Sequence, residues 1–128
     1  MPLRRYLLVS IPFLAIVFAS SASYGILEIS AHELLTNSSN VIWCLKNENT
    51  EVIVNGQILD LVDPSEYSTQ TVIYVKLSYP VITCVFPKTY KNTLTTLGVN
   101  HNIKVKGILH FYPDEGNIDI KNCTLLSQ

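Results

Sequence analysis

The sequence has 128 residues, a formal net charge of −1 and 48% hydrophobic residues, a length that supports one domain with a single core and excludes two. Arg4 and Arg5, near the N-terminus, are the only arginines of the sequence. The rest of the chain contains seven lysines and ten acidic residues, so its formal charge without these two arginines is −3. Proteins that bind nucleic acid usually carry a basic stripe and arginine forks, so this balance argues against that class of partner.

The first 22 residues have the pattern of a secretory signal peptide. Arg4 and Arg5 form its basic region, Tyr6–Phe18 is an apolar run, and Ser20–Ala22 supplies small residues for a cleavage site. The apolar run is shorter than the roughly twenty residues that span a membrane. We therefore expect cleavage after Ala22 and a periplasmic or secreted protein without a stable membrane span. The alternative is an uncleaved anchor.

Residues 23–50 are predicted to form an N-terminal segment that contains one helix. Ser30 and Glu33 stand at the spacing of a capping box, and apolar residues follow at helical intervals. These apolar residues are Leu34, Leu35, Val41, Ile42 and Leu45. We therefore expect an amphipathic helix over residues 31–46, although the polar residues 37–40 interrupt its pattern.

The remaining residues, 51–128, are predicted to form a barrel. Apolar and polar residues alternate in five segments that are separated by proline, glycine or asparagine, which is the pattern of half-buried strands. The five strands are expected at 51–62, 69–79, 81–86, 102–111 and 118–126. Between the third and the fourth, Tyr90, Leu94 and Leu97 recur at helical spacing and predict a short helix over residues 88–97.

Two of these strands carry a glycine within the apolar alternation, Gly56 and Gly107. A strand that serves two faces of a closed sheet must coil sharply, and glycine permits this coiling. A helix between the third and fourth of five strands is the order of the OB-fold, a Greek-key barrel. The expected fold class is therefore mainly β with two helices: a five-stranded OB-fold barrel preceded by an N-terminal helix, with a second helix that closes one end.

Five short motifs carry a family resemblance. They are Val52–Gly56, Ile82–Phe86, Leu94–Gly98, Ile103–Gly107 and Asn122–Cys123. With these motifs, the stretch from Leu34 to Leu125 resembles the exported bacterial OB-fold proteins grouped as tRNA-anticodon-binding-domain-like. The resemblance implies the fold and carries no common activity.

The usual binding face of an OB barrel is formed by strands two and three, and it is flanked by the loops that join strands one to two and four to five. The candidate ligand-binding residues are Tyr74, Lys76, Tyr79 and Thr83 on this face and Tyr67 and Tyr112 on its rims. Exposed tyrosines and a lysine can stack on bases or sugars. The alternative is that the tyrosines only pack against the barrel.

Both flanking loops are acidic. Their carboxylates are Asp60, Asp63 and Glu66 in the first and Asp114, Glu115 and Asp119 in the second. Such walls repel a phosphate backbone, so we expect a protein, a peptide or a small polar ligand, and single-stranded nucleic acid is the alternative. Any single carboxylate can equally be a solvated turn residue.

No catalytic or metal-binding constellation stands out. His32, His101 and His110 are scattered along the chain, whereas catalysis needs convergent partners, and the cysteine spacings fit no zinc site. We therefore expect no enzymatic activity, no metal and no cofactor.

Cys84 and Cys123 fall in strands three and five, which are neighbours in an OB barrel, so we expect them to lie close together. In an oxidising compartment they can form a disulfide. Neighbouring strands often present poor disulfide geometry, so two buried, reduced thiols remain the other possibility.

Overall fold

The computed structural model of the protein describes residues 26–127, and the expected signal peptide lies outside them. The strands are β3 (Leu27–Ser30), β4 (Glu51–Val62), β5 (Val72–Leu77), β6 (Ile82–Pro87), β7 (Asn102–Tyr112) and β8 (Asn117–Ser127). The helices are α2 (Ala31–Asn37), α3 (Val41–Asn47) and α4 (Lys91–Leu97), with two short 3-10 helices, η1 (Pro64–Glu66) and η2 (Lys88–Tyr90).

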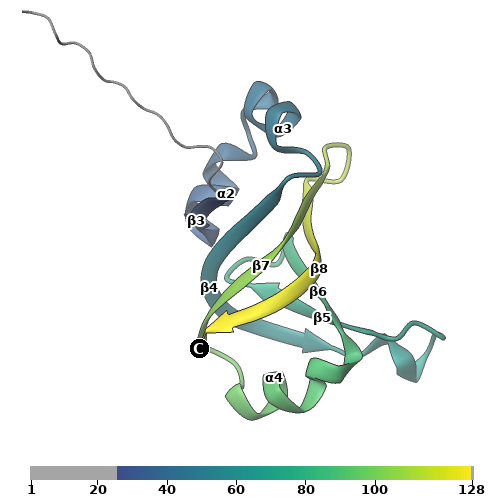
Figure 1. The fold of residues 1–128 in the computed structure, drawn as a ribbon. Coiled ribbons are helices and arrows are strands. Elements are labelled where there is room, and N and C mark those ends of the chain that lie inside the picture. The colour runs from purple at the N-terminus through teal and green to yellow at the C-terminus, as the bar shows by residue number, and fades with distance from the viewer. Residues whose placement is uncertain (1–25, 128) are drawn as a thin grey trace, which may run out of the picture.

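The strands curl into a closed barrel (Figure 1). Their order is β3-β4-β5-β6-β8-β7, and β4 closes the barrel because it also pairs with β7. The first half of β4, residues 51–57, pairs with β7, and the second half, residues 58–62, pairs with β5. Strands β6 and β8 run parallel. The five strands from β4 to β8 therefore form the OB-fold that the sequence predicts.

Both predicted glycine positions lie where strands approach closely. A Cβ atom at Gly56 would stand 2.8 Å from Leu77 Cγ, and one at Gly107 would stand 2.6 Å from the carbonyl oxygen of Lys121. The register of β7 against β8 also shifts between Lys106 and Ile108, where Gly107 alone stands opposite Asn122 and Cys123, so the extra residue of the bulge lies on β8. The glycines allow the tight coiling of β4 and β7 because no side chain fits between the strands there.

The predicted helix at 88–97 exists, with η2 as its first turn, and it covers one end of the barrel (Figure 1). Leu94 is fully buried, while Tyr90 and Leu97 are partly buried against the core. The rings of Phe86 and Tyr90 lie 5.1 Å apart between centroids. Gly98 ends the helix with φ of 81°, a left-handed conformation that glycine adopts at little cost.

The N-terminal helix differs from the prediction, because residues 38–40 divide it into α2 and α3. The capping box at Ser30 and Glu33 is present as expected. The break arises from local side-chain bonds: Ser38 Oγ donates to the Leu35 carbonyl, and Asn40 Oδ1 accepts from the Trp43 N–H and caps a new helix. Such bonds compete with helix continuation.

Two further features were not predicted. Residues 27–30 form β3, which pairs in parallel with β4 and adds a sixth strand at its edge. The second strand of the barrel is also shorter than the expected 69–79, because Ser78 takes a positive φ of 61° directly after Leu77. Its hydroxyl accepts from the Gln57 N–H instead, which fixes the turn against β4.

Candidate functional site

A polar hollow of about 410 Å³ opens on the outer surface of β5, β6 and β8, beside the turn that joins β7 to β8. Its lining residues are Val62, Tyr74, Lys76, Thr83, Tyr112, Glu115, Asn117 and Asp119. Four of the six residues proposed from the sequence, Tyr74, Lys76, Thr83 and Tyr112, therefore share one concave surface.

The floor of the hollow is a row of side chains that crosses adjacent strands. Lys76 on β5 stands opposite Thr83 on β6, and Thr83 stands opposite Asp119 on β8. Directly opposed residues point to the same face of a sheet. His110 on β7 continues the row beyond Asp119. The row thus sets a cation, a hydroxyl and a carboxylate side by side.

The row is electrostatically coupled. Lys76 Nζ donates to Thr83 Oγ1 at 2.8 Å. Burial raises the pKa of the Asp119 carboxyl, and the charges of Lys121, His110 and Lys76 oppose that rise. Burial of a carboxylate disfavours its charged form, so a ligand that brings a hydrogen-bond donor or a positive charge would stabilise the charged form of Asp119.

The two tyrosines of the hollow come from opposite ends of the sheet. Tyr74 on β5 donates its hydroxyl to Gln70 Oε1 at 2.5 Å. Tyr112 ends β7, where its ring meets the His110 ring edge-on at 4.5 Å and lies 5.8 Å from Lys121 Nζ. Both rings are half-buried, so each packs on the barrel and still presents a surface to the hollow.

The other two predicted tyrosines do not join this group. Tyr79 lies in the turn after β5, where its hydroxyl is 3.0 Å from His32 Nδ1 and its ring packs against the core. Tyr67 follows η1 and is 73% exposed, without a place in the hollow. Asn117 and Val62 line the hollow but were missed, because the sequence does not show how far the β7–β8 turn folds over the sheet.

One carboxylate of the first flanking loop, Asp63, is paired with lysines, which reduces the negative charge expected there. The Asp63 carboxylate accepts from Ser65 and pairs with Lys91 Nζ at 2.7 Å, and Lys88 Nζ lies 3.7 Å away. The hydrogen bond from Lys91 is the main reason that the pKa of Asp63 falls below its usual range. Among the acidic side chains that the structure describes, Glu115 of the second loop and Asp119 of β8 line the hollow.

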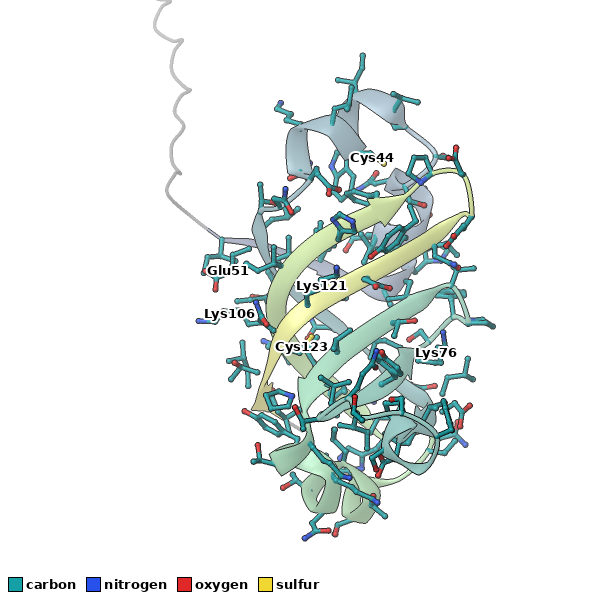
Figure 2. The ribbon with its side chains drawn as sticks, turned by 90° about the vertical axis from the view of Figure 1, so that its right-hand side faces the viewer. Cys44, Glu51, Lys76, Lys106, Lys121 and Cys123 are labelled. Atoms are coloured by element: carbon teal, nitrogen blue, oxygen red, sulfur yellow. The ribbon has the colours of Figure 1, made fainter. Side chains whose placement is uncertain are left out.

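The lysines of the described chain do not gather into one stripe. Lys104 pairs with Glu28 at 3.0 Å, and Lys106 lies 4.0 Å from Glu51. In Figure 2, Lys106 and Glu51 lie at the edge of the molecule opposite to Lys76. The phosphate-neutralising track that a nucleic-acid partner needs is therefore interrupted by carboxylates.

The cysteines are thiols in the structure. Cys84 and Cys123 are buried on the neighbouring strands β6 and β8, and Cys123 Sγ donates to the Ile120 carbonyl at 3.0 Å. A hydrogen bond with Cys123, together with burial, raises the pKa of Cys84. Cys44 is separate, on α3, and burial raises its pKa as well. The expected proximity of Cys84 and Cys123 is present, and the disulfide between them stays a prediction.

No protein-family model matches the chain, and no curated protein is significantly similar to it. Among solved structures, a candidate nucleic-acid-binding lipoprotein from Klebsiella pneumoniae subsp. pneumoniae superposes with a TM-score of 0.61 and 14% identity, over 80% of this chain and 92% of that chain. A candidate aspartyl-tRNA synthetase from Leishmania major Friedlin gives 0.52 and 8% identity, over 89% of this chain and 23% of that chain. At these identities the likeness establishes the OB-fold alone.

Residues 26–127 contain no group of three or more histidine, cysteine, aspartate or glutamate side chains arranged to hold a metal ion. In the same part of the chain, none of the helices has the length and apolar character needed to cross a bilayer.

Proposed function

We propose that this chain is a non-enzymatic OB-fold binding module that holds a peptide or another polar ligand on the β5–β6–β8 face. The observation that carries the proposal is the row of Lys76, Thr83 and Asp119 on the floor of a concave surface whose lining also includes Tyr74 and Tyr112. Ligand sites combine concavity with a few polar groups that fix orientation, and this hollow supplies both.

The absence of catalysis is part of the proposal. The Lys76 ammonium donates to the Thr83 hydroxyl at 2.8 Å. The hydroxyl of Thr83 accepts from that ammonium, and Asp119 lies on the next strand. Activation of a hydroxyl nucleophile needs a base within hydrogen-bond reach, and the described residues around the hollow provide no such pair.

Single-stranded nucleic acid is the second candidate, because Tyr74, Tyr112 and Lys76 form the kind of stacking platform that OB-folds use for it. Glu115 and Asp119 on the same surface oppose it. We also propose that the protein is exported to the periplasm or beyond, a proposal that rests on the pattern of residues 1–22. The intact mass of the protein from expressing cells distinguishes cleavage after Ala22 from a retained anchor.

The binding proposal is tested by titrating the purified protein with an immobilised peptide array and with single-stranded oligonucleotides at low salt. We expect peptide binding that Tyr74→Ala weakens roughly threefold to tenfold, because an aromatic contact is worth about 0.5–1.5 kcal/mol. Tyr67→Ala is the matched control, since Tyr67 is exposed and lies outside the hollow. Equal losses in both variants, or tighter binding of oligonucleotide than of any peptide, would refute the proposal.

A further inference from the structure

A second, apolar groove of about 360 Å³ lies between α3 and the β7–β8 turn. Val41 and Leu45 of α3 form one wall, and Phe111, Pro113 and Ile118 form the other. Apolar surface of this kind on a small domain marks a place where another molecule binds. The groove shares only Tyr112 and Asn117 with the lining of the hollow already described, so most of its wall is a separate surface that is open to a ligand.

Trp43 of helix α3 faces the barrel, whereas the aliphatic side chains of the helix point outward. Trp43 packs against the core and meets the Phe111 ring edge-on at 6.0 Å. Val41, Ile42 and Leu45 are 71%, 76% and 75% exposed, and α3 contains no buried residue. Three aliphatic side chains therefore project from a helix that the barrel does not cover.

The groove is preformed. Glu48, which follows α3, accepts from the Phe111 N–H at 2.9 Å and lies 2.6 Å from His110 Nδ1. The two bonds tie the end of α3 to β7 and set the width of the groove before any ligand arrives. A preformed site avoids the ordering cost that weakens binding to mobile surfaces.

The groove and the polar hollow are continuous. Tyr112 and Asn117, the last residue of β7 and the first of β8, line both. Figure 1 shows the β7–β8 turn beside α3. An extended peptide advances about 3.3 Å per residue, so a segment that crosses this turn places side chains in both depressions within a few residues of each other.

Charge selects among the possible occupants. Glu115 and Asp119 line the hollow, and Asp114 lies in the turn. Lys76 adds one positive charge on the floor of the hollow, where it donates to the neutral Thr83 hydroxyl. Two further cations stand at the margins, Lys46 on α3 and Lys121 beside the Tyr112 ring. An anionic lipid surface is repelled by the carboxylates of the turn, and a basic side chain is attracted by them.

A second copy of the chain fits less well. In a twofold contact each surface meets itself, so the same carboxylates would face each other. The three exposed aliphatic side chains and the groove form one small patch, whereas a specific interface buries roughly 800 Å² on each partner. A short peptide segment matches the size of the groove.

We propose that the groove and the hollow form one recognition site for an extended segment of a partner protein. An apolar side chain of this segment lies in the groove, with Val41 and Leu45 on one side and Ile118 on the other. A basic side chain of the same segment lies against Glu115 and Asp119. This inference rests on the proposed function, which makes the hollow a binding site. It goes beyond that function by specifying a ligand with one apolar and one basic side chain.

The test uses fluorescent octapeptides of glycine and serine that carry one leucine and one arginine at spacings of one to five residues, titrated against the full chain by anisotropy. We expect binding at one or two spacings only, and at least tenfold weaker binding when glutamate replaces arginine. Leu45→Ser should weaken binding at least tenfold, while Val99→Ser, at another exposed aliphatic residue, should stay within twofold. Both variants alter exposed side chains, and thermal melting confirms that they fold.

The outcomes separate the two proposals. If Tyr74→Ala weakens peptide binding and Leu45→Ser does not, the inference fails and the binding function stands. If neither variant changes binding, both fail. Sedimentation of the wild type, but not of Leu45→Ser, with phosphatidylglycerol vesicles would identify a lipid surface as the occupant and overturn the inference. A dimer at micromolar concentration that Leu45→Ser dissociates would overturn it as well.

Discussion

Gly107→Ala tests the central geometric feature of the barrel, the close approach of β7 and β8. An added Cβ would stand 2.6 Å from the Lys121 carbonyl oxygen, 2.7 Å from Ile120 Cγ2 and 3.2 Å from Cys123 Sγ. Since carbon and oxygen atoms seldom approach within 3.0 Å, β8 must move away by several tenths of an ångström. Gly107 has no positive φ in the structure, so the cost comes from contact alone.

The magnitude follows from two terms. Overpacking of a closed core costs about 1–3 kcal/mol, and displacement of β8 weakens one or two ladder hydrogen bonds, each worth about 0.5–1.5 kcal/mol. We expect a loss of about 3 kcal/mol, which lowers the melting temperature of a domain of this size by roughly 12–24 °C. Thermal unfolding followed by circular dichroism measures it.

Gly116→Ala is the control for this experiment. No atom lies within 4 Å of a Cβ at Gly116, but its φ is +70°, so the variant reports backbone strain alone, worth about 1–2 kcal/mol. A melting temperature of Gly107→Ala within 3 °C of the wild type, or above that of Gly116→Ala, would refute the close approach of β7 and β8.

Three further changes have defined outcomes. Leu94→Ala should lower the free energy of unfolding by about 2–5 kcal/mol, because Leu94 is the fully buried residue of α4. Leu97→Ala, at a partly exposed residue, should cost less, and equal costs in urea unfolding would contradict this packing. Asn40→Ala should cost about 1 kcal/mol by removing the cap of α3, and hydrogen exchange of α3 amides should accelerate without a change in the barrel. The pKa of Asp63 is lowered chiefly by Lys91, so its contribution to stability is complete above its unfolded pKa of about 4 and is lost as the pH falls through the folded value. The stability difference between the wild type and Asp63→Asn should therefore shrink below pH 4 in acid titrations, and a constant difference would contradict the pairing.

The barrel could be predicted because its signals are local and agree with one another. The strand alternation, the two glycines and the Tyr90–Leu97 spacing each depend on residues that are close in sequence, and each fits the same topology. The division of the N-terminal helix was harder to foresee. The break at residues 38–40 depends on Asn40 capping a new helix, which competes with an apolar periodicity that continues through it.

The candidate face was predicted in part for a related reason. Tyr74, Lys76 and Thr83 follow from strand alternation, because β5 and β6 pair in the expected register. Tyr79 lies outside the hollow because Ser78 turns the chain away from the strand. Asp63 and Lys91 pair although they are 28 positions apart in the sequence, and no local sequence pattern predicts this pairing. The exposure of α3 has the same origin, since Trp43 rather than the aliphatic stripe faces the barrel.

The divided pairing of β4 has a consequence for the order in which the molecule can assemble. Glu51 pairs with Ile108, and Gln57 pairs with Asn102. The first half of β4 therefore pairs with a strand that follows it by about fifty residues in the sequence. Contacts of such long sequence separation slow folding. A polypeptide that emerges from its N-terminus therefore leaves β4 with an open flank until residues 102–112 arrive, and the barrel closes only when β8, which follows them, joins β6 to β7.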